Sequence, residues 1–299
     1  MMRNRGTLGV PSKPTRRIAG FGEIADAYDV CLVDQWGVLH DGHMAQPEAV
    51  DVMQRLKAAG KQLVILSNSS RRVEATRRNM VRMEIDPCLF DGFVTSGEQV
   101  WQALSRRSDP FYAAFTAHCA VYQWVEDGVF LDGLDVERVD SIDAAELILL
   151  NGTRRDRPLQ TEAIISRGVE RGLPLVCTNS DLVVITPAGE LVECPGAIAR
   201  RYAALGGVVR WYGKPTPGAY RMALQGIDPG ARVVAIGDSL YHDIGGAQAA
   251  GIDSLFISDG IHRPDLCEGG DGTHTCESLE RVYRQHNVAP TYCSRRLVW

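Results

Sequence analysis

Short apolar runs alternate along this chain with stretches in which apolar residues recur every three or four positions. Residues 30–33, 62–66 and 232–236 are apolar runs of strand length, and residues 48–59 show the helical spacing. Alternation of this kind predicts βα units, a parallel sheet and right-handed crossover connections.

The middle of the chain repeats this pattern. Strands are expected at residues 120–125, 146–150 and 173–177, and helices at 161–171 and 198–205. Residues 182–185 and 190–193 flank a Pro-Ala-Gly turn, which predicts a hairpin. The strand expected at residues 208–212 marks a return to the first pattern.

The two series of units predict a two-domain α/β protein with a Rossmann-like parallel core and a second α/β domain inserted into it. The predicted divisions are a flexible basic arm (1–18), a core (19–96 and 206–290), the inserted domain (97–205) and a tail (291–299).

Composition narrows the function classes. The 299 residues are 45% apolar and carry a net charge of −5, and the five basic residues among the first 22 leave the rest with about −10. An acidic body argues against nucleic-acid binding. No apolar run approaches the ~18 residues of a membrane span. Eight cysteines without a C-x-x-C pair predict a reduced, cytoplasmic protein.

Polar side chains follow four of the predicted strands, where open α/β sheets bind their ligands. These residues are Asp34, Ser67, Asn68, Lys214, Asp238 and Asp243. Two or three acids can hold Mg²⁺, which prefers oxygen ligands. A hydroxyl, an amide and an ammonium group can hold a phosphate. Together they predict Mg²⁺-dependent phosphoryl transfer with an in-line nucleophile.

The order and the residues of these motifs resemble the motifs of the haloacid dehalogenase superfamily. The resemblance is closest to its class IIA phosphatases of the NagD and pyridoxal-phosphate phosphatase types. The resemblance covers residues 24–260. It rests on D-x-x-G-V-L at Asp34, S-N at Ser67, G-K-P around Lys214 and G-D-x-x-x-x-D-I at Asp238. In that family the insert is a C2-type cap that closes over the site.

The resemblance also implies roles for individual residues. Asp34 would attack phosphorus and form an aspartyl-phosphate, while Ser67, Asn68 and Lys214 would bind the phosphoryl group. Mg²⁺ would be held by Asp34, the Trp36 carbonyl, Asp238 and Asp243. From the cap, the stretch that contains Asn179 and Asp181 would face the substrate.

Trp36 departs from the family pattern. The phosphatases of the family have an Asp at this position, which protonates the leaving oxygen and then activates water. An indole can do neither. The nearest titratable alternatives are His40, Asp41, His43 and His242, none of which is at a family position.

The sequence therefore predicts a phosphatase that acts on a small phosphorylated metabolite through Asp34, with a bias to good leaving groups such as aryl or acyl phosphates. The alternative is a catalytically silent protein that binds a phosphate ligand and senses it. The sequence leaves the oligomeric state open, although class IIA relatives are often dimers through the cap, so a homodimer is one expectation from the resemblance.

A second pattern points to a serine esterase. Two short segments match sequence motifs of GDSL-type esterases: Gly237-Asp238-Ser239-Leu240 and Asp259-Gly260-Ile261-His262. In this interpretation Ser239 is the nucleophile and His262 is the base. Only about twenty residues separate these segments, whereas such esterases place most of the domain between them. The pattern also leaves Asp34 and Lys214 without a role.

Overall fold

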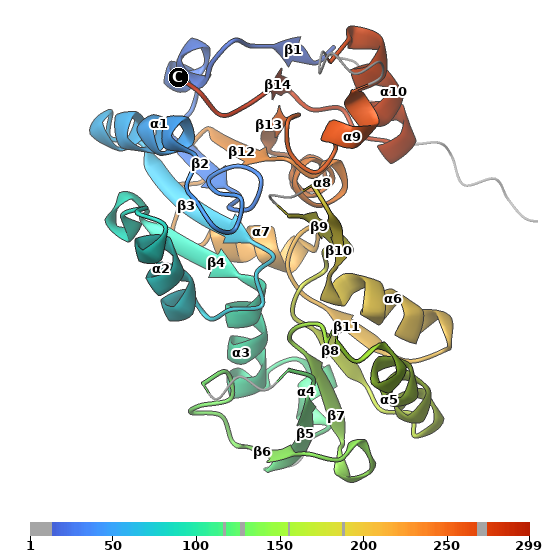
Figure 1. Cartoon of the computed structure of the whole chain (residues 1–299). Helices are drawn as coiled ribbons and strands as arrows, with labels where there is room; N and C mark the ends of the chain where they lie inside the picture. Colours follow the sequence, from blue (N-terminus) through green and yellow to red (C-terminus); the bar gives the residue numbers. More distant parts are fainter. Residues whose placement is uncertain (1–13, 116–117, 126–128, 155, 187–188, 268–273) are drawn as a thin grey trace, which may run out of the picture.

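A computed structural model describes residues 14–115, 118–125, 129–154, 156–186, 189–267 and 274–299. It has two lobes, each built on its own parallel sheet (Figure 1). Chain segments from both ends form the upper lobe, the core, and the middle of the chain forms the lower lobe, the cap. None of the helices in these ranges is long and apolar enough to cross a membrane.

The core sheet is parallel throughout, with the strand order β1-β14-β13-β12-β2-β3-β4. Its strands are β1 (Arg16–Arg17), β2 (Val30–Val33), β3 (Gln62–Ser67), β4 (Gly92–Thr95), β12 (Val233–Gly237), β13 (Asp253–Ile257) and β14 (Tyr292–Ser294). Its helices are α1 (Pro47–Ala58), α2 (Val73–Arg82), α7 (Pro217–Ala223), α8 (Gly245–Ala250), α9 (Arg263–Leu266) and α10 (Cys276–His286). Single turns are η1 (Phe21–Glu23), η2 (Ala25–Ala27), η3 (Pro87–Leu89) and the π-helical η5 (Leu240–Ile244).

Strand β2 shows why this sheet is buried on both faces. All four of its residues are buried, and alternate side chains point to opposite faces. Cys31 and Val33 pack in one cluster with the apolar stripe of α1. Val30 and Leu32 pack on the other face with α7 and Ala247 of α8. Burial on both faces is typical of parallel sheets and explains the continuous apolar runs in the sequence.

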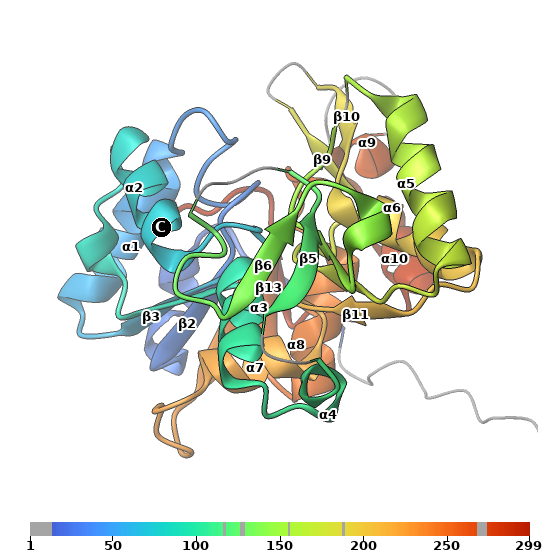
Figure 2. The ribbon, with the colours of Figure 1, turned by 90° about the horizontal axis from the view of Figure 1, so that it is seen from below.

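The cap has a parallel sheet with the order β11-β8-β7-β5-β6. Its strands are β5 (Cys119–Gln123), β6 (Val136–Val139), β7 (Leu147–Leu150), β8 (Leu175–Cys177) and β11 (Val209–Trp211). Its helices are α4 (Pro110–Ala113), α5 (Pro158–Glu170), α6 (Pro195–Ala204) and the single turn η4 (Ile142–Ala144). Helices α5 and α6 run along one side of this sheet (Figure 2).

Helix α3 (Ser96–Arg106) joins the lobes, because it follows core strand β4 and packs Val100 and Leu104 against the cap strands. The predicted hairpin is present as antiparallel strands β9 (Val183–Ile185) and β10 (Leu191–Glu193). In Figure 1 this hairpin extends from the cap toward the core near α8. The α/β class and the two parallel sheets predicted from the sequence are therefore confirmed.

The divisions between domains differ from the predicted ones at three places. Strand β11 pairs with β8 of the cap, so the cap extends beyond residue 205 to about residue 211. The segment predicted as a tail contains β14, which pairs with β13 in the core sheet. Of the predicted basic arm, Arg16–Arg17 form β1 and pair with β14, whereas residues 1–13 lie outside the described ranges.

Backbone pairing explains these differences. Strand β1 is the edge strand and β14 lies next to it, and they have only two and three residues, so they carry little apolar pattern. Their position depends on partners far away in the chain, which no local periodicity reveals.

Candidate active site

Three acids gather at the carboxyl ends of neighbouring core strands. Asp34 follows β2 and Asp238 follows β12, which pairs with β2. Asp243 comes from the π-helical turn after β12. One carboxylate oxygen from each lies within 4.8 Å of the others. The sequence prediction that the strand ends bring these acids together is consistent with this geometry.

Lys214 is the cation of this cluster. Its ammonium group lies 2.8 Å from Asp34 Oδ1 and 2.6 Å from Asp243 Oδ1, and its side chain is only 3% exposed. Burial opposes the charged lysine, but Asp243 and Asp34 outweigh that effect and raise the Lys214 pKa. Lys214 follows cap strand β11 rather than a core strand, so the segment that returns from cap to core carries it.

Two glycines let the backbone approach the acids. A Cβ on Gly37, where φ is +79°, would lie 2.0 Å from Asp238 Oδ2, and one on Gly260 would lie 2.1 Å from the same atom. The backbone N–H of Ile261 donates to that oxygen at 2.9 Å. Asp238 is therefore enclosed by backbone on two sides and has a fixed position.

Burial dominates the electrostatics of the acids. It raises the Asp34 pKa to about 7, with Lys214 acting in the opposite direction. Burial and the charges of Asp34 and Asp243 raise the Asp238 pKa well above its usual range. Three carboxylates thus share one ammonium group in a buried site. Such an excess of negative charge and of oxygen ligands fits a divalent cation like Mg²⁺.

This excess of negative charge predicts how the stability of the metal-free protein, kept in a chelator, depends on pH. The Asp34 pKa is higher in the folded chain than in the unfolded chain, so proton binding favours the folded state. We expect the free energy of unfolding of the native chain to fall relative to that of Asp34→Asn as pH rises from about 4 to about 7. Urea denaturation at several pH values would measure this difference, and a difference independent of pH would contradict it.

The residues predicted to bind phosphate lie at the end of β3. Ser67 is buried, and its hydroxyl accepts from the Ser69 N–H at 3.2 Å. The Asn68 amide donates to Ser180 Oγ at 3.0 Å and to Asp181 Oδ1 at 2.8 Å, and its oxygen accepts from the Lys214 N–H at 2.6 Å. In this conformation Asn68 therefore joins the cap to the core, and its role toward phosphate stays a prediction.

The cap reaches the acid cluster through residues 179–181. The Asn179 side chain accepts from the Asp181 N–H at 2.8 Å. Asp181 lies 3.3 Å from His242 Nδ1, and His242 Nε2 lies 3.2 Å from the Ser180 carbonyl. His242 was named from the sequence as a possible substitute for the missing acid, but its contacts with Asp181 and Ser180 of the cap were not predicted. Tertiary packing brings these residues together. The only local signal in the sequence was the position of His242 between Asp238 and Asp243.

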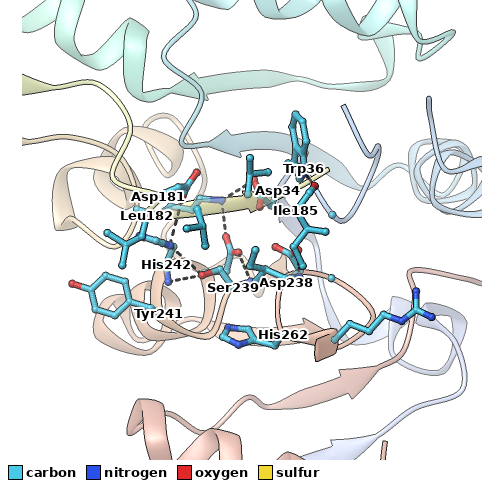
Figure 3. Close-up of a pocket in the computed structure, with 18 of the residues that line it drawn as sticks. Asp34, Trp36, Asp181, Leu182, Ile185, Asp238, Ser239, Tyr241, His242 and His262 are labelled. Carbon is cyan, nitrogen blue, oxygen red and sulfur yellow. Dashed lines mark hydrogen bonds and ion pairs between the residues drawn. The ribbon is translucent and has the colours of Figure 1, made fainter. Parts of the chain in front are cut away.

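Trp36 also connects core and cap. Its indole N–H donates to the Ile185 carbonyl of hairpin strand β9 at 3.2 Å. Figure 3 shows Trp36 on one side of the site with Ile185 close by, while Asp181 and His242 lie on the other side. The ring is packed edge-on against His40, with centroids 5.9 Å apart. Trp36 is thus a wall of the site rather than a titrating group.

Two cavities meet at Asp34. One, of about 610 Å³, includes apolar Leu182, Ile185 and Tyr241 together with all three acids. The other, of about 410 Å³, contains Ser67, Asn68 and Asn179. Asp34, Trp36, Asp181 and Val184 line both. We call the first of these the active-site cavity.

The side chains that could replace the missing acid differ in their surroundings. Burial lowers the His40 pKa to about 4, so its imidazole is neutral at neutral pH. Asp41 Oδ1 accepts from the His43 and Met44 N–H groups. His242 and Asp41 line the active-site cavity.

The serine esterase hypothesis is not supported by the geometry. The His262 ring contacts the Leu240 N–H through Nε2 and Asp265 through Nδ1, not Ser239. Ser239 Oγ lies 3.1 Å from His242 Nδ1, but the same nitrogen faces Asp181. A catalytic triad needs serine and acid on opposite ring nitrogens.

Comparison with known proteins agrees with this geometry. A family model described as haloacid dehalogenase-like hydrolase matches residues 31–129, and a second, HAD-hydrolase-like model matches residues 211–282. The rat phospholysine phosphohistidine inorganic pyrophosphate phosphatase is 26% identical over 250 residues, which cover 78% of this chain and 84% of that protein.

Solved structures share the whole fold. A haloacid dehalogenase-like hydrolase from Brucella suis has a TM-score of 0.77 and 26% identity, covering 94% of this chain and 100% of that one. A glycerol phosphate phosphatase from Mycobacterium tuberculosis, solved with magnesium, has a TM-score of 0.68 and 20% identity, covering 91% and 77%. The chain is thus similar to haloacid dehalogenase-like hydrolases of the phosphatase type, and it shares their fold, with a parallel core sheet and a separate parallel cap sheet.

Proposed function

We propose that the chain hydrolyses the phosphate ester or anhydride of a small organic molecule, with Asp34 as nucleophile and Mg²⁺ as the bound metal. The observation that carries the proposal is the buried group of Asp34, Asp238 and Asp243 around a single ammonium group at the carboxyl edge of the sheet. The magnesium complex of a protein with the same fold also supports it.

The metal would be held by Asp34, Asp238 and Asp243 together with the Trp36 carbonyl. When bound, Mg²⁺ supplies positive charge that offsets the charge developing on the transferring phosphoryl group. Lys214 contributes a second positive charge and holds the Asp34 carboxylate in one orientation through the 2.8 Å contact. Ser67 and Asn68 would bind phosphoryl oxygens from the adjoining cavity once the substrate is present.

The reaction has two steps. Asp34 Oδ attacks phosphorus, the bond from phosphorus to the leaving oxygen breaks, and the leaving group departs with its electron pair. A water oxygen then attacks the phosphorus of the aspartyl-phosphate, the bond to Asp34 breaks with its electron pair left on the carboxylate, and both water protons end on the phosphate product. An aryl or acyl leaving group departs as an anion and needs no proton.

The apolar walls of the active-site cavity agree with such leaving groups. Leu182, Ile185 and Tyr241 lie beside the acids in Figure 3. A planar or apolar leaving group would bury surface there, worth about 25 cal/mol per Å².

This proposal predicts a strong preference among substrates. We expect kcat/KM of the native chain for p-nitrophenyl phosphate to exceed that for glycerol 3-phosphate by at least ~10²-fold, because general acid assistance is worth about 10²- to 10⁴-fold to a poor leaving group. Trp36→Asp should raise glycerol 3-phosphate hydrolysis selectively. Steady-state kinetics with both substrates would measure the two ratios.

Trp36→Phe is the matched control, because it keeps an aromatic ring, removes the hydrogen bond to the Ile185 carbonyl and adds no acid. Equal kcat/KM of the native chain for the two substrates would contradict the proposed bias. Ligand binding without turnover or a trapped phospho-enzyme on any substrate would instead favour the alternative, a silent phosphate-binding sensor.

A further inference from the structure

A third cavity lies beside the active-site cavity and differs from it in the charge of its lining residues. It has a volume of about 650 Å³, and four arginines line it. We call it the arginine cavity and define it by Arg17, Arg263, Arg295 and Arg296, with Asp259 and Ser258. Among the residues that the structure describes, Asp259 is the one acid in its lining, in a chain whose net charge is −5.

The fold brings these residues together from distant parts of the chain. Arg17 ends β1, Ser258 and Asp259 follow β13, and Arg295 and Arg296 follow β14. Figure 1 shows these strands near α9 and α10 at the upper end of the core. The arginine cavity therefore lies at the carboxyl edge of the parallel sheet, as the acids do, and this edge is where open α/β sheets bind ligands.

Partners within the described ranges leave most of this positive charge uncompensated. Arg295 lies 3.4 Å from Asp259, and Arg296 lies 3.4 Å from Glu48, with both arginine side chains more than half exposed. Long, exposed ion pairs of this kind contribute little. Arg17 donates to the Cys276 sulfur, and Arg263 forms no ion pair with any other residue that the structure describes.

The imidazole of His274 contacts two residues of the arginine cavity, Ser258 and Asp259. Its side chain is 1% exposed and lies 3.4 Å from Asp259. Its pKa is lowered, first by burial, and the charges of Arg295, Arg17 and Arg263 add to this lowering against the opposite effect of Asp259. Three of the four guanidinium groups therefore lie near one buried side chain.

We propose that the arginine cavity binds the phosphate group of a small molecule at a site separate from the catalytic acids. Guanidinium groups match phosphate oxygens in geometry and charge, and the volume is that of a small-molecule site. Asp34 does not line this cavity, which shares only Asp259 and Arg263 with the active-site cavity. A bound phosphate group would therefore lie next to the active site without occupying it.

The test uses the full chain in EDTA, where the uncompensated acids of the active site repel anions. Isothermal titration calorimetry with inorganic phosphate should give one site per chain. Arg17→Gln combined with Arg295→Gln should weaken that binding at least tenfold. The matched control is Arg78→Gln with Arg82→Gln, which removes two exposed charges from α2 and should change the affinity less than threefold.

Two further measurements complete the test. Glycerol 3-phosphate binding as tightly as inorganic phosphate would identify an ester as the ligand, whereas binding of inorganic phosphate alone would identify the free product. If the double variant is unstable, Arg296→Gln can replace it in the test. This single change should also weaken phosphate binding, but by less than the double change. Equal affinity in the native chain and the Arg17/Arg295 variant, or an equal loss in the α2 control, would overturn the proposal.

Discussion

Replacing the Asp34 carboxylate with an amide, in Asp34→Asn, is expected to lower kcat by about 10⁴- to 10⁶-fold, the range found when a nucleophile is removed. The amide cannot attack phosphorus and is a weak ligand for Mg²⁺. Acid-stable incorporation of labelled phosphate into the protein should disappear as well. Initial rates on p-nitrophenyl phosphate, with a quenched labelling experiment, would measure both effects.

Asp41→Asn is the matched control, because Asp41 lines the same cavity and an asparagine oxygen can still accept from the His43 and Met44 N–H groups. On p-nitrophenyl phosphate, whose leaving group needs no acid, we expect its kcat to stay within about tenfold of the native value, because Asp41 does not attack phosphorus. Unfolding is not expected to explain the loss in Asp34→Asn, since removing one of three acids around one ammonium group relieves repulsion. A kcat within tenfold of native in Asp34→Asn would show that another residue attacks phosphorus.

Lys214→Met is expected to have the largest effect on stability. The substitution leaves Asp34 and Asp243 buried without their ammonium partner. Breaking a buried ion pair by removing one partner costs about 3–5 kcal/mol. The cost should shrink toward pH 5, because the raised Asp34 pKa allows that carboxylate to become neutral. Urea denaturation in EDTA at pH 7.5 and pH 5 would measure both values.

Lys57→Met provides a comparison within the same chain. Lys57 forms a 2.5 Å ion pair with Asp91, but both side chains are about one-third exposed. Exposed pairs contribute about 0–1 kcal/mol, so this variant should lose less than about 1 kcal/mol. Equal losses in the two lysine variants would mean that Lys214 is not the electrostatic centre of the buried site.

The apolar pattern predicted most of the core because strands buried on both faces must be apolar along their length. Strands β2, β3 and β12 were recognised on this basis, and each ends near its predicted residue. The hairpin β9–β10 was also recognised, because a Pro-Ala-Gly turn separates its two arms. The short strands β1 and β14 were not, because two or three residues carry no readable period.

Strand β11 shows a different limit of prediction from the apolar pattern. Its apolar residues indicated a strand, but they could not indicate which of two parallel sheets it joins. Pairing with β8 places it in the cap. Lys214 therefore reaches Asp34 from a segment that crosses between the lobes, and contacts between cap and core decide its position.

By itself, the sequence determined the α/β class, the alternation of strands and helices, and the acids at the strand ends. These features are local, since apolar period and the residue after a strand can be read in a short window. Only the tertiary structure decided that the Trp36 indole bonds the Ile185 carbonyl, that Asn68 and His242 join the cap residues, and that four arginines share one cavity. Those contacts join residues far apart in the chain, and packing of the whole fold, not local pattern, fixes their distances.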